Sequence, residues 1–252
     1  MARADLLKKL FSSFKQDNKE MFYAVASEII EDEKKKNHGI LADDLKLILN
    51  GNYQKKNINT LSANTPRDKD KDMPLIEIMY PEKYFSDLIL SENKIIQLEQ
   101  MIKEFNNWEV LVSNGVFPTR RALFYGPPGC GKTLAAQALA GEIGIPMLYV
   151  RFDALISSYL GETASNISKV FDYAKKDSWL IFFDEFDAIG RSRNDSTEHG
   201  EIKRVVNAFL QQIDNYKGHS LIIAATNFEQ SLDYAIWRRF DETVGFEMSA
   251  ID

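Results

Sequence analysis

Nine consecutive residues near the middle of the chain have the composition and spacing of a phosphate-binding loop. The segment GPPGCGKTL, residues 126–134, contains the pattern G-x-x-x-x-G-K-T. Glycines in such a loop let backbone N–H groups approach phosphate oxygens without a Cβ in the way. Lys132 would reach the β- and γ-phosphates of a nucleotide, and the Thr133 hydroxyl would bind Mg²⁺. We therefore predict a site for ATP and Mg²⁺, in which Cys130 is a spacer at a variable position.

A pair of carboxylates follows an apolar run later in the chain. The run WLIFF, residues 179–183, is typical of a buried strand, and Asp184 and Glu185 come directly after it. Ligands of open α/β sheets gather at the carboxyl ends of the strands, so these acids are expected beside the phosphate loop. Asp184 would then bind Mg²⁺, and Glu185 would orient and polarise the attacking water. The alternative is that both acids cap the following turn. The predicted nucleotide-binding residues are Gly126, Pro127, Pro128, Gly129, Cys130, Gly131, Lys132, Thr133, Leu134 and Asp184, and the predicted metal ligands are Thr133 and Asp184.

Three more polar residues are candidates for catalysis. Asn227 directly follows the run LIIAAT and could hydrogen-bond both the attacking water and the γ-phosphate, although asparagine after a strand is commonly a turn residue. Arg238 and Arg239 precede the last apolar run and could form ordinary surface ion pairs. A guanidinium supplied to the transition state is worth roughly 10³ to 10⁵ in rate. Supplied across a subunit boundary, it would make hydrolysis depend on assembly.

The elements around these residues alternate in a regular way. From residue 122 onward, short apolar runs alternate with segments whose apolar residues recur at helical spacing. This alternation predicts βαβ units and a parallel sheet covered by helices on both faces. The apolar runs, in order, are ALFY, IPMLYV, WLIFF, SLIIAA and ETVGF.

The first third of the chain has a different pattern. Residues 1–50 contain three apolar stripes at helical spacing and are expected to form a small all-α domain whose stripes pack together. Residues 51–74 are polar, with charges of both signs, and are expected to be a flexible linker. Residues 75–252 then form the α/β domain.

Composition excludes several other classes of protein. The net charge of −6 argues against a dedicated nucleic-acid binder, which would usually be basic. No apolar run approaches the eighteen or so residues that a membrane span needs, and the N-terminus lacks the features of a signal peptide. The one cysteine, Cys130, is consistent with a reducing compartment. A cytoplasmic protein with no membrane partner is expected.

Four motifs in this order resemble the AAA ATPase family, in its protein-remodelling branch: GPPGCGKT, LIFFDEFD, IIAATN and LDYAIWRRFD. The resemblance covers residues 80–246. It implies a five-stranded parallel sheet flanked by helices and a ring, usually hexameric, with ATP at the subunit interfaces. It also implies that Asn227 is the first sensor residue and that Arg238 and Arg239 are arginine fingers.

The resemblance gives a role to a tyrosine that is otherwise read as a partly buried surface residue. Tyr159, Leu160 and Gly161 match the family's aromatic–hydrophobic–glycine pore loop, which would grip an extended polypeptide. Ser158 stands where the family often has a basic residue, which would weaken the grip. A second pore-facing loop is expected within residues 190–201, without an assigned residue. The family's C-terminal helical lid is expected to be absent, because the chain ends at Asp252.

The function that these residues favour is ATP hydrolysis coupled to unfolding, remodelling or translocation of protein substrates through a homo-hexameric ring. A closer similarity to bacterial stand-alone AAA proteins, some encoded beside a subtilisin-like protease, suggests a protease or adaptor that binds residues 1–50 and a role in antiviral defence. That helical domain could instead only stabilise the assembly. One alternative function is a nucleic-acid-handling ATPase of the clamp-loader or initiator type. The other is a nucleotide-gated scaffold, which intact catalytic residues disfavour. The chain has no H-E-x-x-H signature of a fused metalloprotease.

Overall fold

The structure is a computed structural model of the 252-residue chain. The residues that it describes are 4–35, 39–49, 65–68, 72–151, 155, 160–186, 199–232 and 234–247. The chain divides into two compact units, Met1–Thr60 and Leu61–Asp252, and each is described by itself.

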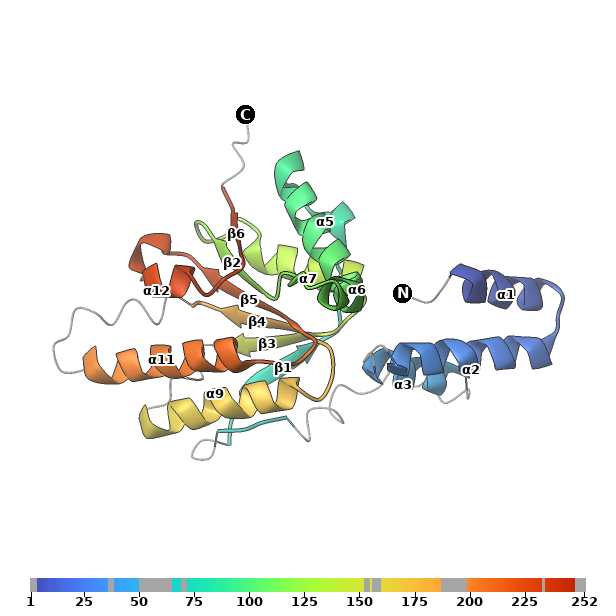
Figure 1. Cartoon of the computed structure of the whole chain (residues 1–252), viewed down its shortest axis with the longest axis horizontal. Helices are drawn as coiled ribbons and strands as arrows, with labels where there is room; N and C mark the ends of the chain where they lie inside the picture. The colour runs from blue at the N-terminus through green and yellow to red at the C-terminus, as the bar shows by residue number, and fades with distance from the viewer. Residues whose placement is uncertain are drawn as a thin grey trace. The chain divides into compact units, whose positions relative to one another are not determined.

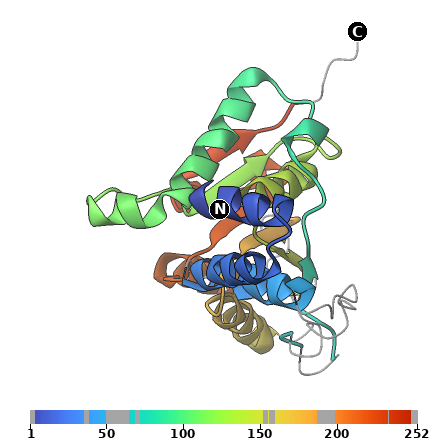
Figure 2. The same cartoon turned by 90° about the vertical axis from the view of Figure 1, so that its right-hand side faces the viewer.

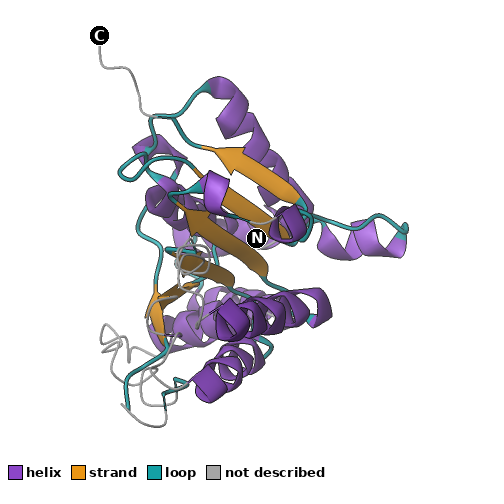
Figure 3. Cartoon of the chain, turned by 90° about the vertical axis from the view of Figure 1, so that its left-hand side faces the viewer, coloured by secondary structure: helices purple, strands orange, loops and turns teal. Residues whose placement is uncertain are grey.

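The second unit is built on a twisted sheet of six strands in the order β1-β3-β4-β5-β2-β6 (Figure 3). Its strands are β1 (Ile76–Met79), β2 (Arg121–Tyr125), β3 (Met147–Arg151), β4 (Leu180–Asp184), β5 (Leu221–Thr226) and β6 (Glu242–Gly245). Strands β2 to β6 are mutually parallel, which confirms the predicted α/β fold with five parallel strands. The sixth strand, β1, was not predicted; it pairs antiparallel with β3 at the edge of the sheet.

Helices cover both faces of this sheet (Figures 1 and 2). One face carries α5 (Glu92–Asn106) and α7 (Lys132–Ile143), whose apolar residues form one buried cluster with those of the strands. The opposite face carries α9 (Leu160–Ala174) and α11 (His199–Asn215), which lie side by side. The other short helices among the described residues are α6 (Trp108–Ser113), α12 (Tyr234–Trp237), and the 3₁₀ turns η1 (Phe85–Asp87) and η3 (Glu229–Ser231).

Strand alternation divides the apolar side chains between the two faces. On β4, Phe182 belongs to the cluster under α5 and α7, whereas Phe183 stacks on Phe171 of α9, with ring centroids 5.7 Å apart. Phe183 also meets Phe209 of α11 edge to face, at 4.9 Å. Both rings on β4 are fully buried, so the strand that carries the predicted acids is anchored on both sides. The polar residues that follow such strands are therefore held at the carboxyl edge of the sheet.

The described part of the first unit contains α1 (Ala4–Lys15), α2 (Lys19–Lys35) and α3 (Gly39–Leu49). Leu6, Val25 and Ile29 form its described core, with Leu10 and Leu45 packed against them. The expectation that the whole α1 stripe is buried is wrong. Three of its apolar side chains, Leu7, Phe11 and Phe14, are 40%, 71% and 75% exposed. Successive residues of a helix are separated by about 100°, so positions 7, 11 and 14 face a different direction from positions 6, 10 and 13. One partner helix therefore cannot cover both sets.

The segment expected to be a linker ends in ordered structure within the second unit. Arg67 and Pro74 form an isolated antiparallel bridge, and the side chain of Asp68 is buried. The Asp68 carboxylate accepts a 2.7 Å hydrogen bond from Asn166, on α9. Residues 65–68 and 72–75 are therefore attached to the outer helix layer.

Candidate functional site

The glycine-rich loop lies between β2 and α7, as its motif requires. Gly126 has φ +143°, and a side chain at this position would collide with the Phe246 carbonyl oxygen. Gly131 caps α7 in the left-handed conformation, with φ +92°, and α7 begins at Lys132. The loop thus presents the N-terminal N–H groups of a twelve-residue helix, whose positive potential favours phosphate. Pro128 and Gly129 are exposed, and Cys130 and Leu134 are half-buried.

Lys132 connects the loop to the neighbouring strand. Its side chain is buried, and its ammonium group donates to the carbonyl oxygens of Gly126 and Pro127, both at 2.8 Å. The third partner is the Asn227 side-chain oxygen, at 2.7 Å. Residues that are 95 positions apart therefore share one hydrogen bond, because β5 and β2 are adjacent. Cys130 donates its S–H to the Pro127 carbonyl at 2.8 Å, within the same loop.

The three residues predicted for metal binding and water activation line one pocket. This pocket has a volume of about 480 Å³, and its walls include Thr133, Asp184 and Glu185. A hydroxyl and a carboxylate are oxygen ligands of the kind that Mg²⁺ prefers, and Mg²⁺ is usually bound by one or two carboxylates together with phosphate oxygens. The donor set therefore fits Mg²⁺ bound with a nucleotide.

Glu185 has an unusual backbone conformation for a non-glycine residue. Its φ is +54°, and its N–H donates to its neighbour's carboxylate, at Asp184 Oδ1, over 2.9 Å. Such a conformation costs of order 1 kcal/mol and persists where the surroundings fix it, often at functional sites. The side chain is exposed toward the pocket that it lines, which agrees with a role in contacting water or substrate.

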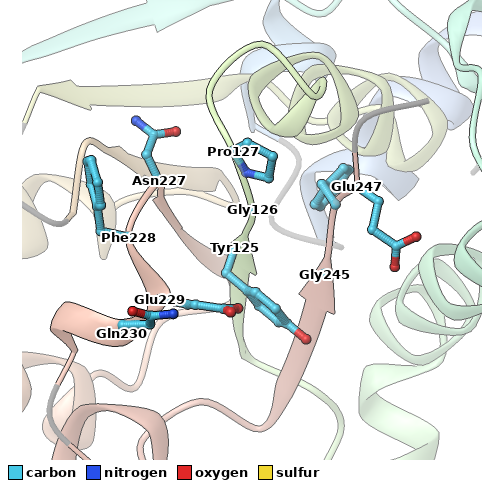
Figure 4. Close-up of a pocket in the computed structure, with 10 residues that line it drawn as sticks. Tyr125, Gly126, Pro127, Asn227, Phe228, Glu229, Gln230, Gly245 and Glu247 are labelled. Carbon is cyan, nitrogen blue, oxygen red and sulfur yellow. The ribbon is translucent and has the colours of Figure 1, made fainter. Parts of the chain in front are cut away.

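A second pocket, of about 620 Å³, adjoins the start of the phosphate loop (Figure 4). One wall is the segment from Asn227 to Gln230, and the other is formed by Gly245 and Glu247. Tyr125 lies between them, and its ring leaves no room for a side chain at position 245. The two pockets touch different parts of the phosphate motif: Gly126 and Pro127 line the second, and Thr133 lines the first.

The two predicted arginine fingers lie apart from these pockets. Neither arginine is among the described residues that line them. Arg238 is exposed, with its guanidinium 4.7 Å from the centre of the Tyr234 ring. Arg239 forms an ion pair with Asp214 at 3.2 Å. Both guanidinium groups are therefore near the surface of their own protomer.

The predicted pore loop is only partly within the described residues. Tyr159 lies outside them, and Leu160 and Gly161 form the first turn of α9. Most of the second expected pore-facing loop, residues 190–198, also lies outside the described part of the chain. Among the described helices, none is long and apolar enough to cross a membrane.

Four residues of the first pocket were not predicted from the sequence: the apolar Met79 and the polar Glu77, Gln137 and Tyr149. Gln137 lies on α7, four residues after Thr133, so helical spacing could have placed it beside the site. Tyr149 donates a 2.8 Å hydrogen bond to Asp184 Oδ2. Its position, and that of Glu77, follow from strand pairing, which no local signal in the sequence specifies.

Comparison with known proteins agrees with the geometry. Residues 122–248 match the family described as "ATPase family associated with various cellular activities (AAA)". An uncharacterized AAA family ATPase of Sinorhizobium fredii is 45% identical over 254 residues, which cover 98% of this chain and 74% of that protein.

Proteasome-related proteins of archaea are also similar. The proteasome-activating nucleotidase of Pyrococcus abyssi is 35% identical over 188 residues, covering 71% of this chain and 48% of the nucleotidase. A putative 26S proteasome regulatory subunit homolog of Methanocaldococcus jannaschii is 33% identical over 177 residues, covering 69% of this chain and 47% of that protein. The matched part thus spans about half the length of these two relatives.

Proposed function

This chain belongs to the AAA family of ATPases, and we propose that it couples ATP hydrolysis to the remodelling of protein substrates in an oligomeric ring, with a homo-hexamer as the expected form. The observation that carries the proposal is the convergence of Lys132, Asn227 and the pocket of Thr133, Asp184 and Glu185 around one loop. These groups are the ones that ATP hydrolysis needs, and they come from three adjacent strands.

The residues have distinct roles in the proposed reaction. Lys132 exchanges its loop carbonyl partners for the β- and γ-phosphate oxygens, since its ammonium group already lies against the loop through the carbonyls of Gly126 and Pro127. Thr133 and Asp184 hold Mg²⁺, which neutralises phosphate charge when bound. Glu185 accepts a hydrogen bond from the attacking water, and Asn227 holds that water against the γ-phosphate. As water adds to phosphorus and the bond to the β-phosphate oxygen breaks, the water proton passes to Glu185.

Arg238 and Arg239 act on the nucleotide of a neighbouring protomer. Their distance from the pockets of their own chain supports this assignment, because a group near the surface can reach an adjacent site. Arg239 would exchange Asp214 for the γ-phosphate of the neighbour, a stronger anion for a guanidinium fork. Hydrolysis then depends on assembly.

The substrate is proposed to be an extended polypeptide, gripped by Tyr159, Leu160 and Gly161. The similarity to proteasome-activating nucleotidases supports a protein substrate.

A protease or adaptor that binds the helical domain of residues 1–50 is the proposed partner. The exposed side chains of Phe11 and Phe14 on α1 support this, because they offer apolar area for contact. The predicted role in antiviral defence has no support from these relatives and stays a prediction.

The test of substrate remodelling is Tyr159→Ala. Basal ATP hydrolysis is expected to stay within about twofold of wild type, because the residue lies outside the motifs that bind nucleotide. The test substrate is a fluorescent protein fused to an unstructured tag. The rate at which it is unfolded is expected to fall at least about tenfold, since the aromatic side chain supplies the contact with substrate. Tyr173→Phe, at a half-buried position on α9, is the control for loss of a tyrosine hydroxyl away from the pore loop, and no change in unfolding is expected. Full unfolding by Tyr159→Ala would contradict the pore-loop assignment, and would leave the ATPase assignment intact.

A further inference from the structure

Tyr149 occupies a position beside the metal-binding pocket that no motif of the sequence predicted. It lies on β3, paired in register with Phe182 of β4 on one side and Glu77 of β1 on the other. Paired residues of adjacent strands project from the same face of the sheet, and Asp184 lies two residues beyond Phe182, on that same face. The Tyr149 ring packs beside Phe182, with centroids 5.9 Å apart, so its hydroxyl extends along the sheet toward Asp184.

The carboxylate of Asp184 is hydrogen-bonded at both of its oxygens. Oδ1 accepts from the backbone N–H of Glu185 at 2.9 Å, and Oδ2 accepts from the Tyr149 hydroxyl at 2.8 Å. Two donors on opposite oxygens fix the rotation of the carboxylate about its Cβ–Cγ bond. Each oxygen retains a further lone pair, so the fixed group still has a free acceptor site on each atom.

We infer that Tyr149 is a positioning residue for the metal: its hydroxyl orients the Asp184 carboxylate for Mg²⁺ bound with the nucleotide. The inference rests on the proposed nucleotide site and concerns the metal step within it. Groups that hydrogen-bond a ligating side chain typically contribute 10- to 100-fold to metal affinity. Tyr149 does not touch the nucleotide in this scheme, so it affects binding only through the metal.

The experiment uses the full chain, a fluorescent ADP analogue, and MgCl₂ titrated into nucleotide-bound protein. The Mg²⁺ midpoint is the Mg²⁺ concentration at which the fluorescence of the bound ADP analogue has made half of its total change. The proposal predicts that Tyr149→Phe raises this midpoint about tenfold. Nucleotide affinity measured in EDTA is expected to stay within about twofold of wild type. Tyr216→Phe is the control: its hydroxyl is also hydrogen-bonded to a side chain, but it lies beside Ser220, at the opposite edge of the sheet, and no change in the Mg²⁺ midpoint is expected.

A double-mutant cycle separates positioning from general packing. In an Asp184→Asn background, Tyr149→Phe is expected to cause no further change in the Mg²⁺ midpoint, because the carboxylate that it orients is gone. The proposal would be overturned by an unchanged Mg²⁺ midpoint in Tyr149→Phe, or by a loss of nucleotide affinity in EDTA as large as the change in that midpoint. Additive effects in the cycle, or failure of Tyr149→Phe to fold, would overturn it as well. If Mg²⁺ does not change the nucleotide affinity of the wild-type protein, the proposed metal site itself is contradicted.

Discussion

At the scale of single residues, the site already contains hydrogen-bond partners that a nucleotide would replace. The Lys132 ammonium group is bound by two carbonyl oxygens and one amide oxygen, all within 2.8 Å. A buried cation is costly unless it is paired or hydrogen-bonded, so these contacts hold the lysine in place without phosphate. Phosphate oxygens, which carry full charge, are stronger acceptors than the neutral oxygens. Binding should therefore exchange one set of partners for another with little movement of the loop.

Glu185→Gln tests the residue assigned to water activation. The substitution keeps size and shape but removes the proton acceptor, so ATP binding should persist while turnover falls about 10²-fold or more. Equilibrium binding of a fluorescent ATP analogue and release of phosphate measure the two effects separately. Glu99→Gln is the control, because Glu99 lies on α5 and is paired with Lys103 at 3.5 Å. Normal turnover in Glu185→Gln would remove Glu185 from its assigned role.

At the scale of elements, strand order decides which residues of the sequence meet. The phosphate loop follows β2, the acids lie at the end of β4, and Asn227 follows β5. These three strands are neighbours in the sheet, in the order β4-β5-β2, although β2 comes before the other two along the chain. Local pattern predicted these strands and the residues that end them, because parallel strands place polar residues at one edge. The contact of Tyr149 with Asp184 depends on register between β3 and β4, which is set by tertiary packing.

The same limit explains β1. Ile76–Met79 is only four residues long and follows a polar segment, so its alternation is too short to distinguish from a loop. Its pairing with β3 brings Glu77 into the wall of the pocket that Thr133, Asp184 and Glu185 also line. Likewise, the helical spacing of α1 was recognised, but which of its two apolar sets faces the core depends on the neighbouring helix.

A pH-dependent contribution to stability is expected where α9, α11 and β5 meet. Tyr216, just after α11, is buried and hydrogen-bonded to the Ala174 carbonyl at 3.1 Å and to Ser220 at 2.9 Å. Burial raises the pKa of Tyr216 to about 12, although the hydrogen bond with Ser220 acts in the opposite direction. A folded-state pKa above the unfolded value of about 10 means that the stabilisation is complete below pH 10 and is lost as the pH rises toward 12.

Tyr216→Phe measures this contribution, because phenylalanine does not ionise. The difference in free energy of unfolding between wild type and variant should be constant from pH 7 to pH 9. It should then fall by about 1 kcal/mol between pH 9 and pH 11, as the unfolded tyrosine releases its proton first. Urea unfolding followed by circular dichroism gives both values. If the difference in free energy of unfolding stays constant up to pH 11, the folded protein does not raise the pKa of Tyr216.

At the scale of the whole molecule, the role proposed for the arginines would make the active site a property of the assembly. Arg239 is held by Asp214, and Asp214 also lies 3.4 Å from Arg121, so the carboxylate keeps a cationic partner when Arg239 leaves. A protomer can therefore extend Arg239 to a neighbour without leaving an uncompensated acid behind. The nucleotide loop of one chain and the arginine of the next would then form a single catalytic unit.

Mixing two inactive variants tests this arrangement. Lys132→Ala damages the nucleotide loop, and Arg239→Ala damages the group offered to a neighbour, so neither is expected to hydrolyse ATP well alone. In a ring of randomly mixed subunits, about one quarter of the interfaces join an intact loop to an intact arginine, and that fraction of wild-type activity should return. Lys132→Ala mixed with Glu185→Gln is the control, because both changes damage the same side of the interface and no rescue is expected. Equal activity in the two mixtures, measured by phosphate release after subunit exchange, would place Arg239 outside the neighbouring site.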